Sequence, residues 1–199
     1  MVKLGLGSFV CALLLVGCGG TKNATPPAAP PVTTTATTTA SGPSALQAEA
    51  TAAAAGDIPD NQMFLRFTNA SAGYSIKYPE GWAQAGKGDH VTIRDKNNVV
   101  RVDIRPGGLP SVAKATRELA GIHANNGPQK ITIGGRPAIK ATYSTVSAPN
   151  PVTGKRVTLD VDRYYLSNGS KEAIVDLGTP HGVDNVDAYR LMIESLRWQ

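Results

Sequence analysis

The chain changes composition at about residue 60, and this change confines a folded core to its C-terminal part. From residue 19 to about residue 60 the sequence is mainly Thr, Ala, Pro and Ser, and it offers no run of large apolar side chains. Such a segment cannot bury enough apolar surface to offset the entropy lost on ordering, so residues 18–60 are predicted to be a disordered tether. Large apolar residues first gather at 63–67, and we expect one globular domain over residues 61–199.

The N-terminus has the order of parts found in secretory signals. Lys3 precedes an apolar run that ends near Val16, and a small residue follows. The run is shorter than the roughly 20 apolar residues that a membrane-spanning helix needs. The residues Leu15-Val16-Gly17-Cys18 resemble the lipobox of bacterial lipoproteins. The resemblance implies that residues 1–17 are a lipoprotein signal peptide, and that Cys18 becomes the lipidated N-terminus. The alternative is an ordinary secretory signal that happens to contain a cysteine.

A lipid on Cys18 would place the domain at the cell membrane, on its extracytoplasmic face. One myristoyl-length chain holds a protein only marginally, whereas the two longer chains of a diacylglyceryl group, with a palmitate for example, anchor it durably. The tether of residues 18–60 would then let the domain reach roughly 35 Å from the anchor.

Cysteine content and charge exclude several classes of function. The two cysteines are Cys11, lost with the signal, and Cys18, used for the lipid, so the domain has no thiol for disulfides, catalysis or metal binding. The net charge is +5, and removal of Lys3 leaves +4, with acids and bases interleaved along the chain. The absence of a clustered basic stripe, together with the compartment, argues against nucleic-acid binding.

The order of apolar patterns predicts strands, a helix, further strands and a final helix. Ser111 is expected to cap a helix that continues to about residue 124, where Asn126-Gly127-Pro128 stops it. Asn168-Gly169 predicts a hairpin with a type I′ turn. The last helix is expected over about 185–196, with Val186 in its apolar stripe. Strands joined by hairpins favour an antiparallel sheet with helices packed on it, an α+β fold.

Three segments are similar to those of PsbP-type domains. They are the strand and turn over 73–82, the hairpin over 133–138 and the closing segment 193–198. The superfamily includes PsbP of photosystem II, a Ran-binding nuclear protein and actinobacterial lipoproteins of the LpqN type. The resemblance covers about residues 63–199 and implies an α-β-α sandwich around a central antiparallel sheet. It brings no catalytic residue.

The sequence points to no catalytic, cofactor-binding or metal site. His90, His123 and His181 lie in three different segments without the spacing of zinc ligands, and surface positions are the simpler interpretation. Asp160 and Asp162 share one face of a strand, as calcium or acid–base pairs do. Basic residues flank them (Lys155, Arg156 and Arg163), which favours ion pairing across strands. Tyr164-Tyr165 breaks the strand alternation, so one ring is expected to face outward. The pair marks either packing beneath a helix, which is favoured, or a binding surface.

These observations favour a membrane-anchored, non-enzymatic binding or scaffolding module with a protein partner in the cell envelope. An exposed patch on the sheet or around the 147–155 loop is the expected contact surface. The rival interpretation is a small-ligand, lipid or glycan binding protein with an apolar groove between sheet and helix. Hydrolysis is the least favoured.

Overall fold

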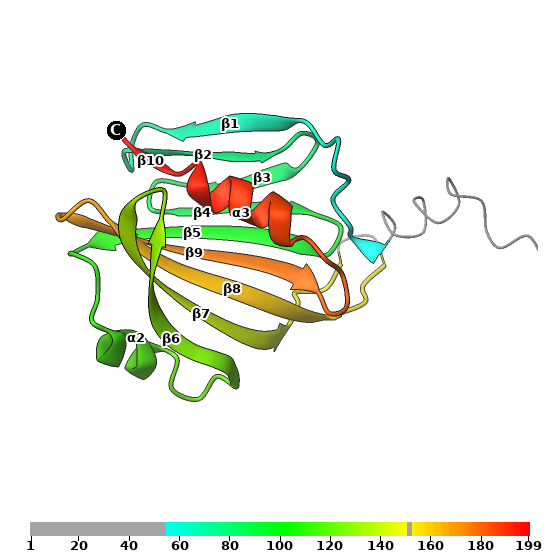
Figure 1. Ribbon diagram of the computed structural model, residues 1–199. Coiled ribbons are helices and arrows are strands. Elements are labelled where there is room, and N and C mark those ends of the chain that lie inside the picture. Colours follow the sequence, from blue (N-terminus) through cyan, green and yellow to red (C-terminus); the bar gives the residue numbers. More distant parts are fainter. Residues whose placement is uncertain (1–54, 151–152) are drawn as a thin grey trace, which may run out of the picture. The chain divides into compact units, whose positions relative to one another are not determined.

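The computed structural model describes residues 55–150 and 153–199, which form two antiparallel sheets and two helices (Figure 1). The predicted signal peptide, Cys18 and nearly all of the predicted tether lie outside the described residues. The elements in chain order are β1 (Phe64–Asn69), β2 (Tyr74–Pro79), β3 (Ala83–Lys87), β4 (His90–Asp95), β5 (Asn98–Pro106), α2 (Val112–Glu118), β6 (Ala124–Ile133), β7 (Arg136–Val146), β8 (Thr158–Ser167), β9 (Lys171–Pro180), α3 (Val186–Glu194) and β10 (Arg197–Trp198).

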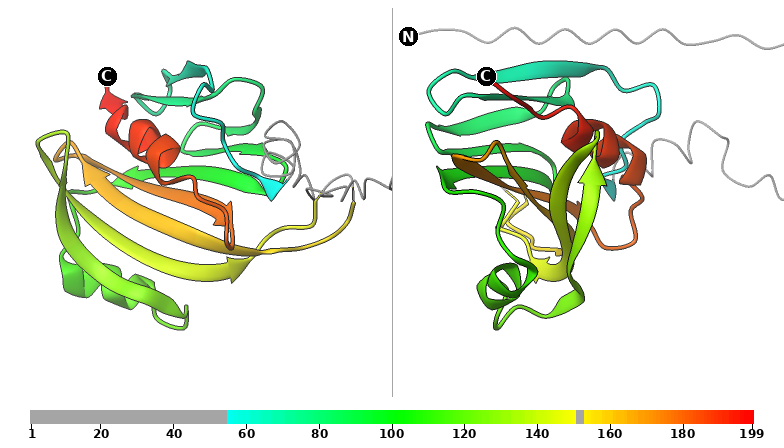
Figure 2. Two further views of the ribbon diagram at one scale, coloured as in Figure 1. Left: turned by 45° about the vertical axis from the view of Figure 1, so that its right-hand side comes forward. Right: turned by 60° about the vertical axis from the view of Figure 1, so that its left-hand side comes forward.

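A seven-stranded sheet forms the middle layer, in the order β3-β4-β5-β9-β8-β7-β6. A three-stranded sheet, in the order β1-β2-β10, and helix α3 lie against one face of it, and α2 lies against the other (Figures 1 and 2). Every strand pair is antiparallel. The expected α+β sandwich around a central antiparallel sheet is confirmed. Neither described helix is long and apolar enough to cross a bilayer.

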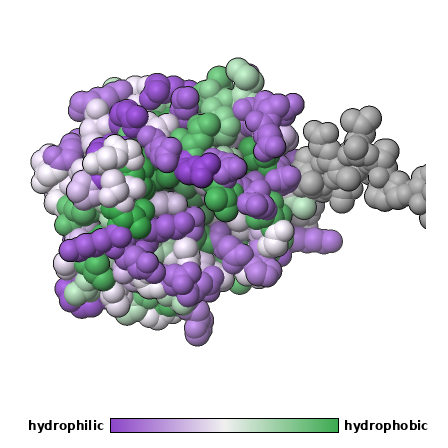
Figure 3. Space-filling view, in the orientation of Figure 1, coloured by the Kyte–Doolittle hydropathy of each residue, from purple (hydrophilic) through white to green (hydrophobic). Residues whose placement is uncertain are grey.

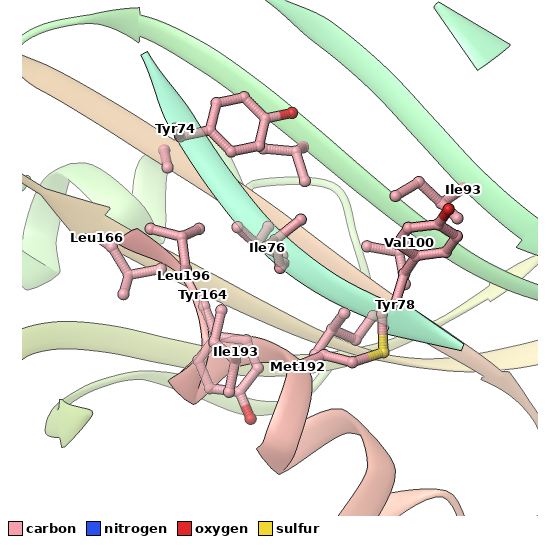
Figure 4. Packing of buried hydrophobic residues seen from close by; sticks show 14 of the residues in the cluster. Tyr74, Ile76, Tyr78, Ile93, Val100, Tyr164, Leu166, Met192, Ile193 and Leu196 are labelled. Carbon is pink, nitrogen blue, oxygen red and sulfur yellow. The ribbon is translucent and has the colours of Figure 1, made fainter. Parts of the chain in front are cut away.

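The main core fills the space between the seven-stranded sheet, the small sheet and α3 (Figure 4). Tyr74 and Ile76 of β2 are fully buried in this core, which also contains Met192 of α3 and Leu196. Trp82, after the β2 turn, is also buried in this core. These residues pack together because alternate side chains of a strand point to one face, and three or four residues separate neighbours on a helix face.

Tyr164 and Tyr165 are both buried, and they lie on opposite faces of the seven-stranded sheet. Tyr164 belongs to the core under α3, whereas Tyr165 packs with Ala115 of α2. The expectation that one ring faces solvent is wrong. Packing beneath a helix is confirmed for both rings, Tyr164 beneath α3 and Tyr165 beneath α2. The broken alternation arises because β8 is covered on both faces, so apolar residues are required at successive positions.

Several predicted boundaries differ from the structure. Ser111 caps α2 through a bond from the Lys114 amide to its hydroxyl (3.2 Å), but the helix ends at Glu118. Gly121, with a φ of +85°, follows the last turn and offers a conformation that other residues rarely adopt. The stop predicted at 126–128 is wrong, because these residues lie in β6 at two register shifts. Val186 in α3 is 67% exposed, so the predicted apolar stripe fails at its first position.

The hairpin at Asn168-Gly169 is confirmed, but its type I′ turn is not. Only Gly169 has a positive φ, and the loop extends from Ser167 to Glu172, which are paired. The Asn168 side chain accepts a hydrogen bond from the Lys171 amide (2.8 Å) and so closes this wider loop.

Packing begins earlier than the domain boundary drawn at residue 61. The Gly56 carbonyl accepts a hydrogen bond from Asn98 Nδ2 at 2.6 Å, and Ile58 is buried in the main core. Ile58 stands alone among polar and small residues, so no apolar pattern in the sequence indicates its burial.

Candidate functional site

A hollow lies beside α3, where the chain approaches β1. Its volume is about 810 Å³. One wall is the segment 57–61 with Phe64, and the other is the start of α3. The sequence had pointed to the sheet or to the 147–155 loop, of which 151–152 lie outside the described residues. The lining residues are Asp57, Ile58, Pro59, Asp60, Asn61, Phe64, Asp184, Asn185, Val186, Asp187, Ala188 and Leu191.

Among the described residues, four carboxylates line this hollow and no Lys or Arg does, although the whole chain carries a net charge of +5. Asp184 and Asp187 have a local role, since acidic groups stabilise the N-terminus of a helix. Asp184 Oδ1 accepts a hydrogen bond from the Val186 amide at 3.1 Å. Asp57 and Asp60 come from the opposite wall and have no such role in α3. The negative charge of the hollow therefore comes from both walls.

Apolar side chains lie between these charges. Phe64 is half-buried and packs against the main core, and Leu191 of α3 is 38% exposed. Val186 is exposed on the same side of α3. Apolar and polar residues alternate over this face of the molecule (Figure 3). A partner group entering here would bury apolar surface while it met negative charge.

A second hollow of about 530 Å³ adjoins the first, because Asp187 and Leu191 line both. Four cations surround it, with Glu194 as a further acid; the cations are Arg66, Lys77, Arg190 and Arg197. Arg190 and Asp187 form an exposed ion pair at the junction (2.7 Å), which contributes little to stability. Together the two hollows form one groove along α3, acidic at one end and mainly basic at the other. We call it the α3 groove.

The acidic wall, residues 56–61, is held by two buried asparagines, and we call this segment the strap. Asn185 Oδ1 accepts a hydrogen bond from the Ile58 amide at 2.8 Å. The Gly56 carbonyl accepts from Asn98 Nδ2 and from Asn185 Nδ2, the latter at 3.1 Å. Asn98 and Asn185 are only 2% and 4% exposed. Nothing in the sequence brings these residues together, since 42 to 129 positions separate the bonded partners.

The aspartates noted in the sequence are in ion pairs and hydrogen bonds. Asp162 contacts Lys140 Nζ of β7 at 2.8 Å, so the predicted cross-strand pairing is confirmed, with a different cation. Asp160 lies 2.7 Å from His181 Nδ1 and accepts a hydrogen bond from Ser144 Oγ. Arg163 points to the opposite face of β8. These aspartates lie outside the α3 groove.

The three histidines do not come together. His90 and His181 are exposed, and each pairs with one aspartate. His90 Nδ1 lies 2.7 Å from Asp103 Oδ1; the hydrogen bond and charge of Asp103 raise the pKa of His90. His123 lies exposed after α2. Within the described ranges, no three His, Cys, Asp or Glu side chains are grouped as a metal would need.

Buried charges also lie on the α2 face of the seven-stranded sheet. Arg163 donates two hydrogen bonds to the Asp176 carboxylate, at 2.6 and 2.7 Å, and Tyr143 donates a third at 3.2 Å. Burial is the main cause that raises the pKa of Tyr143, to about 12, and the charge of Asp176 adds to it. Arg105 likewise bonds the fully buried Glu172 at 2.7 Å. These groups are paired with one another beneath α2, and they open into neither hollow of the α3 groove.

No protein-family model and no curated protein sequence matches this chain. Solved structures of low sequence identity are similar. Cyanobacterial PsbP from Synechocystis sp. PCC 6803 is 16% identical over 72% of this chain and 98% of its own, with a TM-score of 0.49. A crystal structure from Bacteroides thetaiotaomicron is 16% identical over 67% of this chain, with a TM-score of 0.47, and this chain spans about half (48%) of its length. The Ran-binding protein Mog1p of Saccharomyces cerevisiae is 10% identical over 69% of this chain and 96% of its own, with a TM-score of 0.44.

Proposed function

We propose that this protein is a lipid-anchored, non-enzymatic binding module of the cell envelope that holds a segment of a partner protein in the α3 groove. The single observation that carries the proposal is the groove itself, with apolar side chains in its lining and opposite charges at its two ends. The Leu15-Val16-Gly17-Cys18 sequence supports attachment through Cys18 to the extracytoplasmic face of the membrane.

The charges of the groove define the partner segment. Its basic side chains would lie at the end formed by Asp57, Asp60, Asp184 and Asp187, an apolar side chain would cover Leu191, and an acidic group would lie near Arg66 and Lys77. In this open groove one charge pair at 4 Å contributes on the order of 1 kcal/mol, so the charges mainly steer and orient the segment. Burial of the apolar anchor would supply much of the affinity.

A small cationic ligand is the second candidate. Its support is the volume of the acidic hollow, about 810 Å³, which lies within the ~300–1,000 Å³ of small-molecule sites. Such a ligand would raise the melting temperature of the purified protein without any protein partner.

Site-specific photo-cross-linking in cells tests the proposal. A cross-linking residue replaces Leu191 in the groove or, as control, the exposed Ala113 on α2. We expect one envelope protein to be captured at position 191 and not at 113. Asp60→Lys should reduce capture roughly tenfold or more, because it replaces an attraction of about 1 kcal/mol by a repulsion of similar size. Asp89→Lys, the same charge change at an exposed loop away from the groove, should leave capture unchanged. Equal capture at both positions, or none, would contradict the proposal.

The anchor needs its own test. Cys18→Ala should leave the protein unprocessed or released from the membrane fraction. A Cys18→Ala protein that is still lipidated and membrane-bound would show that the lipobox interpretation is wrong.

A further inference from the structure

The strap, residues 56–61, has two roles. It forms the acidic wall of the α3 groove through Asp57 and Asp60. It is also the point where the described chain continues toward residues 1–54, and Gly56 is the first residue of the strap to bond to the rest of the domain. A force on the preceding chain would therefore act on Gly56 before it reached β1.

The strap is attached by few contacts. The Gly56 carbonyl and the Ile58 amide bond to Asn98 and Asn185, and the Ile58 side chain enters the main core. A turn from the Gln62 amide to the Pro59 carbonyl (2.9 Å) follows, and pairing with β2 starts at Phe64. Segments with so few anchors can open locally while the remaining structure stays folded.

Asn185 occupies the N-cap position of α3, but its side chain makes no hydrogen bond to that helix. An asparagine at this position ordinarily accepts a hydrogen bond from the second or third helical amide, here Asp187 or Ala188. Its Oδ1 accepts from the Ile58 amide of the strap instead. Asn185 Nδ2 also donates to Thr179 Oγ1 (2.7 Å) and to Asn98 Oδ1 (3.2 Å), so the side chain is turned away from the helix amides. Holding the strap and capping α3 therefore require different orientations of one side chain.

We propose that the strap is a releasable wall of the α3 groove, with Asn185 as the switch between two states. In the docked state Asn185 holds the strap, and Asp57 and Asp60 complete the acidic end of the groove. In the released state the strap leaves, Asn185 caps α3, and the acidic end loses one wall. A pull through the anchored chain favours the released state, so attachment and partner binding are coupled. This coupling rests on the proposed function, whereas the two states of the strap do not.

Gly56 provides a variant that weakens docking without altering the groove lining. Its φ is +117°, which is strained for any residue with a Cβ, and an added Cβ would lie 3.2 Å from Pro180 Cγ. Gly107 is a matched control, because its φ is +136° and an added Cβ would meet nothing within 4 Å. Both changes introduce similar backbone strain, but only Gly56→Ala affects the strap.

Hydrogen exchange of the full chain, read by NMR at single amides, tests the proposal. In the unchanged protein the Ile58 amide should exchange at least tenfold faster than the amides of β5 and β9. Gly56→Ala should accelerate Ile58 a further tenfold or more and slow the exchange of Ala188, while Gly107→Ala changes neither. Asn185→Ala should accelerate the exchange of Ile58 without slowing that of Ala188. If Asn185 only held the strap in place, Gly56→Ala would not slow Ala188 either, so the slowing of Ala188 in Gly56→Ala distinguishes the switch from a structural role.

Exchange of Ile58 only together with β5 and β9 would overturn the proposal, as would an unchanged Ile58 rate in Gly56→Ala. An Ala188 rate that does not slow in Gly56→Ala would overturn the switch role of Asn185. None of these measurements requires a partner. Failure of cross-linking at position 191 with local opening at Ile58 would therefore remove the proposed function and keep the strap.

Discussion

Replacing Asp176 with Asn should destabilise the domain through the charge that it leaves behind. Asp176 is buried, and its carboxylate accepts hydrogen bonds from Nε and Nη2 of Arg163 and from the Tyr143 hydroxyl. The pKa of Arg163 is raised because these bonds and the negative charge of Asp176 outweigh the effect of burial, which lowers it. With an amide in place of the carboxylate, the guanidinium keeps its position but loses its counter-charge.

Removing one partner of a buried ion pair costs about 3–5 kcal/mol, and we expect the lower end, about 3 kcal/mol, for Asp176→Asn. The reason is that the Arg163 side chain is 17% exposed and can regain some water. At about 2–4 °C per kcal/mol, the melting temperature should fall by roughly 6–12 °C. Urea unfolding followed by tryptophan fluorescence measures the free energy, with an unchanged m-value as the check on two-state behaviour.

A double-mutant cycle separates the charge effect from packing. Arg163→Met alone leaves Asp176 without its cation and removes the contact of the guanidinium with the Tyr143 ring, at 5.4 Å. The double variant Asp176→Asn with Arg163→Met removes both charges, and it should be less destabilised than the sum of the single variants by about 2 kcal/mol. The reasoning is refuted if Asp176→Asn costs less than about 1 kcal/mol, or if the two single effects simply add.

Three further predictions concern other groups of the domain. Trp82→Ala should lower the free energy of unfolding by about 3–5 kcal/mol in urea titrations, because Trp82 is a buried core residue; a loss under about 1 kcal/mol would contradict its role as an anchor. The raised pKa of Tyr143, about 12 against an ordinary 10, means that the folded state holds this proton more tightly. The stability that this difference in pKa contributes is complete below pH 10 and is lost as the pH rises to about 12. Tyrosine absorbance on alkaline titration should show phenolate forming in the unfolded protein at a lower pH than at Tyr143 in the folded protein. NMR titration should place the pKa of His90 above its ordinary value, and Asp103→Asn should remove most of the difference, since Asp103 is the main cause and the charge of Asp89 adds to it; an unchanged His90 value would exclude Asp103 as the cause.

Local sequence signals predicted the parts of the fold that depend on neighbouring residues. The cap at Ser111 and the hairpin at 168–169 are present. The strand and the hairpin within the segments similar to PsbP-type domains, 73–82 and 133–138, are present as well. The predicted helix to residue 124 failed because Gly121 ends α2 and the following residues join β6 by long-range pairing. The outward ring predicted at Tyr164-Tyr165 failed because a helix covers each face of the sheet, which no local pattern shows.

The candidate site could not be predicted from the sequence, for the same reason. In the sequence, Asp57 and Asp60 lie in a polar segment. Asp184 and Asp187 lie at the start of a helix, where acidic residues are common. Only the closed fold places these two pairs on facing walls of one groove. Asn98 and Asn185 likewise read as turn and cap residues, whereas the structure buries both and directs their amides to the strap.

The sequence by itself determined the α+β class, the antiparallel hairpins and the alternation that turns most strand residues toward the core, because periodicity and turn chemistry are local properties of the chain. Tertiary structure alone decided where the domain begins, which charges are buried in pairs, and that opposite charges meet along α3. Those features depend on contacts between residues up to 129 positions apart, and the free energy of such contacts is set by how the sheets and helices pack.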